Sequence, residues 1–351
     1  MHTDSRLQLI RDWLTRDLAL GDYDIRPASA DASFRRYFRV QPGGDKRRSL
    51  IVMDAPPDKE DVAPYLRIRA MLADCGVHVP AVHETDLARG LLLLEDLGAT
   101  QMLTELASGA DPGPLYSAAL EALASIQLHG TSAATQLDPY DAAVLRREMQ
   151  LMPEWFCTRH LGLELDPEER GMIAAAGEFL IAEALAQPQV FVHRDYHSRN
   201  LMITADRSPG VIDFQDALRG PAAYDVVSIL KDCYITWPRA KVEAWVGEFR
   251  DILRRRSGGT SGLCASSAAE YLRWFDLIGL QRHIKVLGIF ARLNWRDGKA
   301  GYLADLPLTL EYVRETASRF PELTAFSRFI ETRLVPNLAA ATGRARMAAR
   351  A

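Results

Sequence analysis

The segment Phe191–Met202, with the sequence FVHRDYHSRNLM, constrains the fold more than any other part of the chain. Its centre is polar and charged, whereas a strand-like lead (Val190–Val192) and an apolar close (Leu201–Ile203) surround it. An unpaired charge buried in a core costs several kcal/mol, so the centre is not a buried strand. A surface loop has no need of such flanks. The segment therefore predicts a loop that is anchored in a core on both sides and meets a polar partner.

Composition excludes several classes of protein. The chain has 351 residues, which suggests about two domains, and its 48% hydrophobic and 25% charged residues are typical of a globular protein with a large core. A net charge of −4 argues against a general nucleic-acid or membrane-surface binder. The four cysteines lack metal-ligand or redox spacing, the N-terminus shows no signal peptide, and the apolar run Leu91–Leu94 is too short to span a bilayer. We expect a cytoplasmic protein, and no protein partner can be inferred.

Hydrophobic periodicity divides the chain into a β-rich part and a helical part. Up to residue 97 it predicts helices over 4–20 and 60–74 and strands near 24–27, 34–40, 49–53, 81–84 and 91–95. Beyond residue 100 it predicts helices over 114–129, 141–159, 166–186, 221–236, 238–255, 268–295 and 306–319, interrupted by strand, loop, strand, turn and strand over 190–215. The tail from residue 336 is expected to fray. The sequence predicts an α+β protein with an N-lobe (1–97) and a mainly helical C-lobe (98–351).

Three residues in the second part have spacing that suits phosphoryl transfer. Asn200 follows Asp195 by five residues, and Asp213 follows Asn200 by thirteen, after an apolar Gly-Val-Ile run. Carboxylate and amide oxygens suit Mg²⁺ bound with nucleotide phosphates. Phosphoryl transfer also needs a carboxylate that orients and deprotonates an acceptor hydroxyl. We therefore predict that Asp195 is the catalytic base and that Asn200 and Asp213 bind the metal.

The His-x-Asp-x-x-x-x-Asn pattern followed by Ile-Asp-Phe resembles the protein-kinase-like fold of the aminoglycoside phosphotransferase family. The resemblance implies two lobes, with ATP and Mg²⁺ as cofactors. It also implies that His193 and Asp225 brace the catalytic loop. Segments 28–39, 94–98 and 213–221 are similar to kinases of that family which act in cell-wall recycling. This likeness implies transfer to the anomeric hydroxyl of an amino sugar, N-acetylmuramate or N-acetylglucosamine, which gives the sugar 1-phosphate.

The expected nucleotide-binding part departs from the kinase pattern. The phosphate-covering loop, 29–33, has no glycine, although Ser33 offers a hydroxyl and an N–H group. Met53 stands where the strand lysine is expected, so Arg35 or Arg36 is the candidate replacement. Arg36 is favoured because its strand neighbours, two residues away on either side, are apolar. Backbone groups of the hinge are expected to bind adenine; the hinge residues are Glu95, Asp96 and Leu97.

Three classes of acceptor remain open: an amino sugar, an aminoglycoside, or a small metabolite such as choline or homoserine. Residues 281–351 carry twelve Lys and Arg against six Asp and Glu, which disfavours a polycationic acceptor and suits a sugar carboxylate. Arg282 and Lys285 are candidates for binding that carboxylate, although they also fit a solvated helix face. Glu148 and Gln215 are weaker candidates for sugar contacts. A nucleotide-binding pseudokinase without turnover is the non-enzyme alternative.

Overall fold

A computed structural model describes residues 4–30, 34–43, 49–206 and 208–348. The chain divides into two compact units: residues 1–105 with 199–216, and residues 106–198 with 217–351. The segment 199–216, expected within the second lobe, thus packs with the first unit. Backbone contacts explain this grouping, because the Ile203 N–H donates to the Thr100 carbonyl at 2.8 Å and the Val211 N–H to the His78 carbonyl at 2.7 Å.

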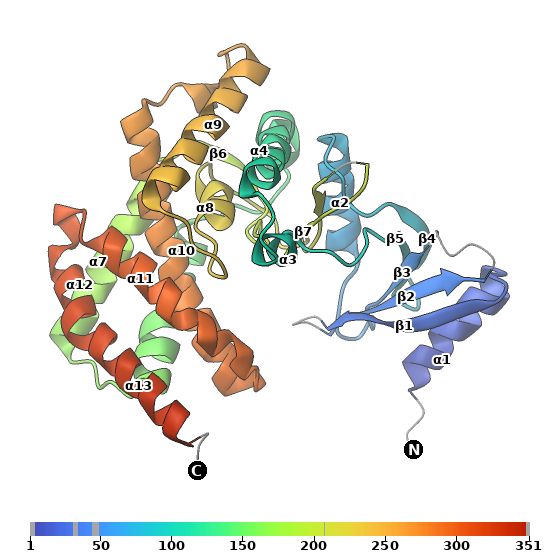
Figure 1. Cartoon of the computed structure of the whole chain (residues 1–351), viewed down its shortest axis with the longest axis horizontal. Coiled ribbons are helices and arrows are strands. Elements are labelled where there is room, and N and C mark those ends of the chain that lie inside the picture. The colour runs from blue at the N-terminus through green and yellow to red at the C-terminus, as the bar shows by residue number, and fades with distance from the viewer. Residues whose placement is uncertain (1–3, 31–33, 44–48, 207, 349–351) are drawn as a thin grey trace. The chain divides into compact units, whose positions relative to one another are not determined.

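The first unit contains a five-stranded antiparallel sheet with strand order β1-β2-β3-β5-β4 (Figure 1). Its strands are β1 (Tyr23–Ala30), β2 (Arg36–Pro42), β3 (Leu50–Asp54), β4 (Val82–Asp86) and β5 (Leu91–Glu95). The other elements of this unit are α1 (Ser5–Asp12), a π-helical turn (Trp13–Asp17), α2 (Ala63–Asp74) and the short pair β7 (Leu201–Met202) and β8 (Gly210–Val211). Helix α1 lies along one face of the sheet, where Ile10 and Leu14 belong to one buried cluster with Phe38, Val40 and Val52.

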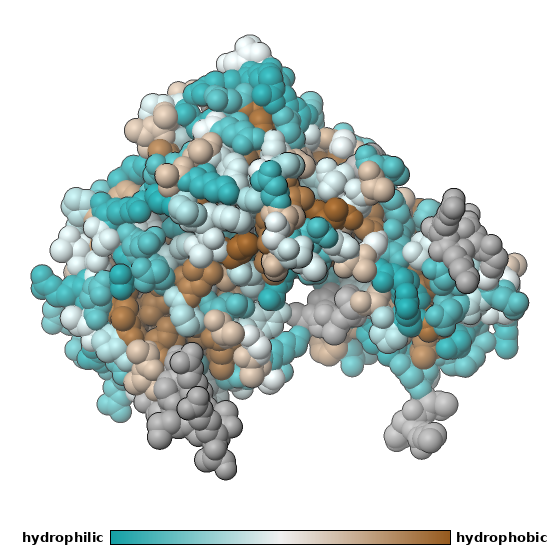
Figure 2. All heavy atoms as spheres, viewed as in Figure 1, coloured by the Kyte–Doolittle hydropathy of each residue, from teal (hydrophilic) through white to brown (hydrophobic). Residues whose placement is uncertain are grey.

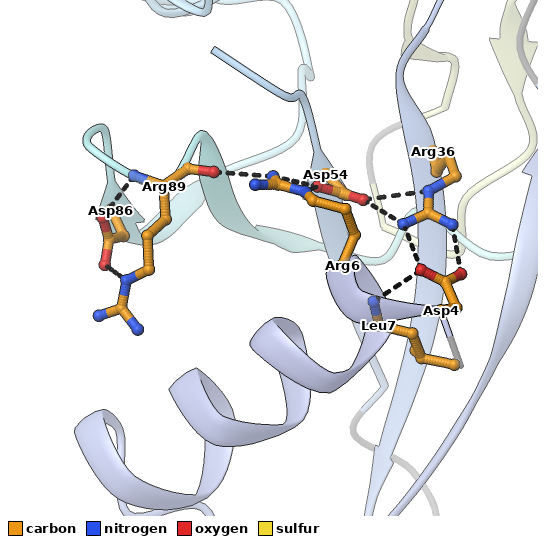
Figure 3. A network of polar contacts seen from close by, with 7 residues as sticks. All are labelled: Asp4, Arg6, Leu7, Arg36, Asp54, Asp86 and Arg89. Atoms are coloured by element: carbon orange, nitrogen blue, oxygen red, sulfur yellow. Dashed lines mark hydrogen bonds and ion pairs between the residues drawn. The ribbon is translucent and has the colours of Figure 1, made fainter. Parts of the chain in front are cut away.

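A network of ion pairs ties α1 to the end of β3 (Figure 3). The Asp54 side chain is completely buried, and its two oxygens accept hydrogen bonds from Arg6 and Arg36, with Nε distances of 2.9 and 3.0 Å. Arg36 also pairs with Asp4, the residue that caps α1, and Arg6 reaches the Arg89 carbonyl at 2.7 Å. The guanidinium of Arg36 therefore lies on the side of the sheet that α1 covers.

Replacing Asp54 by alanine is expected to lower the free energy of unfolding by about 3 kcal/mol. This is the low end for breaking a buried ion pair, because both arginines keep some access to water. Urea unfolding followed by circular dichroism measures the change. Glu178→Ala is the matched control, since it removes a carboxylate from an exposed pair with Arg146. Equal effects of the two substitutions would contradict the structural role of Asp54.

The second unit is mainly helical around one large hydrophobic cluster. Its longer helices are α4 (Pro112–His129), α6 (Ala142–Met149), α7 (Pro167–Leu185), α9 (Arg239–Ser257), α10 (Ala268–Asp297), α11 (Leu306–Ala317) and α13 (Val335–Ala348), and its shorter ones include α5 (Thr131–Ala134), α8 (Tyr224–Leu230) and α12 (Thr324–Phe329). Helix α3 (Met102–Ala107) follows the first sheet in sequence, and strands β6 (Gln189–Val192) and β9 (Leu218–Pro221) pair antiparallel. The cluster draws members from α7, α10 and α11, and Figure 2 shows apolar surface in the region of α11 to α13.

The α+β, two-lobed fold class is confirmed, but some expected elements were wrong. A helix was expected over 221–236, whereas β9 occupies its start and α8 ends at Leu230. Residue Lys231 leaves the helical region with φ −120°. Because the helix ends here, the side chain of Asp232 accepts a hydrogen bond from the Ser198 backbone N–H. The tail is helical as far as Ala348.

Candidate active site

The loop that follows β6 is held at its start by the buried carboxylate of Asp225. Asp225, at the beginning of α8, accepts hydrogen bonds from the backbone N–H groups of His193 at 2.7 Å and Arg194 at 3.0 Å. Burial raises the pKa of Asp225 to about 7, and the nearby Asp195 adds to the effect. The structure thus contains the bracing contacts that the family resemblance implies for Asp225.

Three further hydrogen bonds hold the rest of the loop. The His193 side chain is fully buried, and its Nδ1 accepts from the Asp195 N–H at 3.3 Å. At the other end, both the backbone N–H, at 3.0 Å, and the hydroxyl of Ser198 donate to the buried Asp232. Sequence reasoning missed Asp232. The available signal was a charged pair, Lys231 and Asp232, directly after an apolar helical run.

Asp195 is half-buried on this braced loop, in a strongly positive environment. Burial alone would raise the pKa of its carboxyl group. The charges of Lys285, Arg282 and Arg194 outweigh this effect and, together with the nearby His197, hold the pKa below its ordinary value. Asp195 is therefore an ionised carboxylate at neutral pH, as a residue that accepts a proton from a hydroxyl must be.

Glu148, near the end of α6, is buried beside the loop and has several polar partners. Its Oε1 atom lies 2.6 Å from an Arg194 guanidinium nitrogen and 2.9 Å from Lys285 Nζ. Its Oε2 atom accepts from the Tyr140 hydroxyl and from Gln281 Nε2, the latter at 3.3 Å. Burial opposes ionisation, but Lys285 and Arg194 keep the pKa of Glu148 below its usual value. Glu148 is therefore an internal anchor for two cations.

The two cations predicted on a helix near residue 281 lie in α10 and are buried, so the alternative of a solvated helix face was wrong. Lys285 Nζ donates to the Tyr224 hydroxyl at 3.1 Å in addition to its pair with Glu148. Arg282 is 4% exposed, and its guanidinium contacts Cys233 Sγ at 3.6 Å. Arg282 and Lys285 both contribute positive charge at Asp195. The structure thus brings together Asp195, Arg282, Lys285 and Glu148 in the second unit.

The proposed metal ligands lie together in the first unit. Asn200 Nδ2 donates to Asp213 Oδ2 at 3.2 Å, and Gln215 Nε2 donates to Asp213 Oδ1 at 2.9 Å. Asp213 is exposed and has φ +61°, a left-handed conformation that aspartate tolerates better than most residues. The next residue, Phe214, is fully buried with its ring 4.9 Å from that of Tyr65, which anchors the segment.

This donor set fits Mg²⁺ bound together with nucleotide phosphates. Asn200 and Asp213 offer amide and carboxylate oxygens, and their side chains are close enough to share one ion. Within residues 4–30, 34–43, 49–206 and 208–348, no three His, Cys, Asp or Glu side chains form a cluster that could hold a metal by themselves. A metal in this unit would therefore depend on ligands from a bound phosphate as well. Gln215 supports Asp213 here, although the sequence suggested it as a sugar contact.

The hinge residues are held by contacts within the first unit. Glu95 accepts from the Ala81 N–H at 3.0 Å and contacts His78 at 3.0 Å. Asp96 pairs with Arg39 and accepts from the Gly98 N–H at 2.9 Å. Burial opposes ionisation of Asp96, but the hydrogen bond from the Arg39 guanidinium lowers the pKa of that carboxyl group. The side chain of Leu97 is buried.

The two arginines near the expected phosphate loop have different surroundings. Arg36, favoured from sequence as the replacement for the missing lysine, is paired with Asp54 and Asp4 on the face covered by α1. That preference was based on two apolar neighbours, of which Phe38 belongs to the buried cluster with Ile10 of α1 whereas Phe34 is exposed. Arg35 precedes β2 and acts electrostatically on Tyr65. Met53, in the lysine position, is fully buried. Ser33 lies outside the described residues.

No helix in the described ranges of the chain combines the length and apolar character needed to cross a membrane. The cytoplasmic location expected from the sequence stays a prediction.

Comparisons with known proteins give the chain clear relatives. It is 43% identical to an N-acetylmuramate/N-acetylglucosamine kinase of Pseudomonas aeruginosa, with 94% of this chain and 97% of the relative covered. A protein of the same name from Pseudomonas putida is 42% identical, over 93% and 96% of the two chains. Among solved structures, a Plasmodium vivax ethanolamine kinase matches with a TM-score of 0.63 at 12% identity, over 93% of this chain and 92% of that one, which supports the fold alone.

The model of the phosphotransferase enzyme family matches residues 24–260, the range that contains the catalytic loop and both proposed metal ligands. The match covers more than half of the chain, and it includes the loop that Asp225 braces and the contact between Asn200 and Asp213. The chain belongs to the phosphotransferase enzyme family and is a small-molecule kinase.

Proposed function

We propose that this kinase transfers the γ-phosphate of ATP to the anomeric hydroxyl of N-acetylmuramate or N-acetylglucosamine, giving the sugar 1-phosphate for cell-wall recycling. The observation that carries the substrate class is the 43% identity to an N-acetylmuramate/N-acetylglucosamine kinase over nearly the whole of both chains. The site geometry supports the reaction type, because Asp195 is ionised and held on a braced loop.

In the proposed mechanism, Asp195 orients the acceptor hydroxyl and takes its proton as the oxygen attacks the γ-phosphorus. A bond forms between that oxygen and phosphorus, the bond to the bridging β,γ-oxygen breaks, and ADP leaves with the electron pair. Asn200 and Asp213 would hold Mg²⁺, which neutralises phosphate charge when it is bound. Gln215 keeps Asp213 oriented through its 2.9 Å hydrogen bond. Backbone groups of Glu95, Asp96 and Leu97 remain our proposal for adenine binding.

The charge around Asp195 favours an acidic sugar over a polycation. Arg194, Arg282 and Lys285 all act on Asp195 as positive charges. Lys285 is already paired with Glu148, so Arg282 is the better candidate for the lactyl carboxylate of N-acetylmuramate. Both carboxylate oxygens of Glu148 accept hydrogen bonds from side chains of the protein, so Glu148 is not a candidate for binding the sugar hydroxyls. An aminoglycoside or choline would bring positive charge to this cationic environment, so both are less favourable acceptors.

An ADP-release assay with N-acetylmuramate, N-acetylglucosamine, kanamycin and choline tests the proposal. We expect turnover with at least one amino sugar, and loss of the reducing end as the anomeric hydroxyl is phosphorylated. Turnover with kanamycin alone would instead support an aminoglycoside as the acceptor, and turnover with choline alone would support a small metabolite. Nucleotide binding without turnover of any acceptor would support a pseudokinase.

Arg35 is our candidate for the phosphate contact that the missing lysine would make. Arg35→Ala is expected to raise KM for ATP and to lower kcat, together by about tenfold in kcat/KM, through loss of a charge contact to the phosphates. Arg36→Ala serves as the comparison, since its partners are Asp54 and Asp4 and it should change stability rather than KM. Steady-state kinetics with ATP as the varied substrate distinguish the two. Wild-type kinetics for Arg35→Ala would leave the phosphates to metal and backbone N–H groups.

A further inference from the structure

Arg194, directly before the proposed base, has an unusual backbone conformation. Its φ is +77°, and it is one of three non-glycine residues with positive φ in the described part of the chain, with Ala19 and Asp213. The Cβ atom makes this left-handed region unfavourable for any residue except glycine, and an arginine lacks the short polar side chain that helps aspartate adopt it. Such a residue persists only where the surroundings hold it in place.

Contacts hold both the backbone and the side chain of Arg194. Asp225 accepts from its N–H at 3.0 Å. The guanidinium group lies over the Tyr140 ring, 5.5 Å from its centroid, and donates to Glu148 Oε1 at 2.6 Å. The Arg194 side chain is 22% exposed, whereas that of Glu148 is 9% exposed. The ion pair is thus largely shielded from water. A shielded pair is stronger and more directional than a pair on the surface.

Glu148 is well suited to be the fixed end of this pair. Lys285 and Gln281 bind it from α10, and Tyr140, which precedes α6, binds its other oxygen. With these partners and Arg194, both of its oxygens already accept hydrogen bonds inside the protein. Glu148 therefore has a role that does not require contact with an acceptor or a phosphate.

We infer that Glu148 is a positioning residue, which anchors Arg194 in its left-handed conformation and thereby fixes the direction in which Asp195 presents its carboxylate. The inference rests on the proposed role of Asp195 as the base. It concerns the backbone between β6 and the base, because a change of φ at Arg194 redirects the chain immediately before Asp195. A displacement of the base by about 1 Å is enough to cost on the order of a hundredfold in rate.

Two substitutions at one position test the anchor without altering Glu148. Arg194→Gly and Arg194→Ala both remove the guanidinium group, but glycine adopts positive φ freely and alanine does not. We expect kcat of Arg194→Ala to be at least tenfold lower than that of Arg194→Gly, with KM for ATP alike in the two. Equal losses in both variants would overturn the inference, because they would show that the guanidinium group itself contacts a substrate.

The Glu148→Gln substitution completes a double-mutant cycle. Glutamine keeps the shape of the side chain and one acceptor oxygen but loses the negative charge that pairs with Arg194 and Lys285. We expect kcat to fall about 10- to 100-fold in the wild-type background and less than threefold when Arg194→Gly is already present. An equal fall in both backgrounds would overturn the inference, because it would mean that Glu148 acts without Arg194. Glu178→Gln, the same change in an exposed pair with Arg146, is the matched control.

Amide hydrogen exchange provides a readout that does not depend on turnover. Glu148→Gln is expected to speed exchange of the Asp195 amide, whose N–H is bonded to His193, and to do so less in the Arg194→Gly background. Unchanged exchange would contradict the anchor. The proposed role of Asp195 has a separate test. If Asp195→Asn kept undiminished turnover, Asp195 would not be the base, whereas the hydrogen-exchange result would still test whether Glu148 anchors Arg194.

Discussion

Replacing Asp195 by asparagine is expected to lower kcat by about 10²- to 10⁴-fold while leaving nucleotide affinity within about threefold of the wild-type value. Asparagine has the shape of aspartate and keeps the backbone N–H that donates to His193, so the loop should retain its conformation. It cannot take up the proton of an acceptor hydroxyl. Steady-state kinetics with each amino sugar measure kcat, and calorimetry measures nucleotide binding.

Asp297→Asn is the matched control for this substitution. Asp297 is an exposed aspartate at the end of α10, paired with the neighbouring Arg296. The control should keep wild-type kcat, because the residue lies outside the site described for the second unit. An Asp195→Asn variant with more than about a third of the wild-type kcat would contradict its role as the base.

The ionisation of Asp195 predicts how the rate depends on pH. Burial acts to raise its pKa, but the surrounding cations, with Lys285 first, lower it below the ordinary value. The carboxylate therefore stays ionised as the pH falls through the range in which an ordinary aspartate takes up a proton. The acid limb of the kcat profile should consequently lie below that range. A limb above it would mean that burial outweighs the cations.

The catalytic loop could be predicted from sequence because its information is local. Asp195, Asn200 and Asp213 have characteristic spacing, and the apolar residues on both sides of the loop indicate that its ends are anchored in a core. The brace from Asp225 followed from the family resemblance. Asp232 could not be found in this way, since its role depends on α8 ending early and turning the side chain toward Ser198.

Residues whose roles depend on packing were harder to assign. Alternation along an extended chain separates the sides of Arg35 and Arg36 but does not say which side α1 covers, and in the structure Arg36 pairs with Asp4, the residue that caps α1. From the sequence, Glu148 was a weaker candidate for contacts to the sugar hydroxyls. Its burial results from α10, whose Gln281 and Lys285 lie more than 130 positions away in the sequence.

A second large effect is expected at the proposed metal site, on nucleotide binding that depends on Mg²⁺. Asp213→Ala should weaken nucleotide binding in the presence of Mg²⁺ on the order of a hundredfold, since loss of a carboxylate ligand removes several kcal/mol of interaction with the ion. Without Mg²⁺ the variant and the wild type should bind nucleotide alike. Alanine at this left-handed position costs about 1–3 kcal/mol in backbone strain, but the protein should stay folded because Asp213 is exposed and the buried Phe214 still anchors the segment against Tyr65.

Calorimetric titration of ATP at several Mg²⁺ concentrations measures this effect, and Asp216→Ala provides the matched control. Asp216 is an exposed carboxylate three residues further along the same segment, and it shares with Asp213 a hydrogen bond from Gln215, at 3.5 Å against 2.9 Å. If the two alanine variants lost Mg²⁺-dependent affinity equally, the effect would come from the local charge of the segment. If Asp213→Ala kept the wild-type dependence on Mg²⁺, Asp213 would not be a metal ligand. The metal site would then have to be elsewhere, because the single amide oxygen of Asn200 lacks the negative charge that binds Mg²⁺ in competition with water.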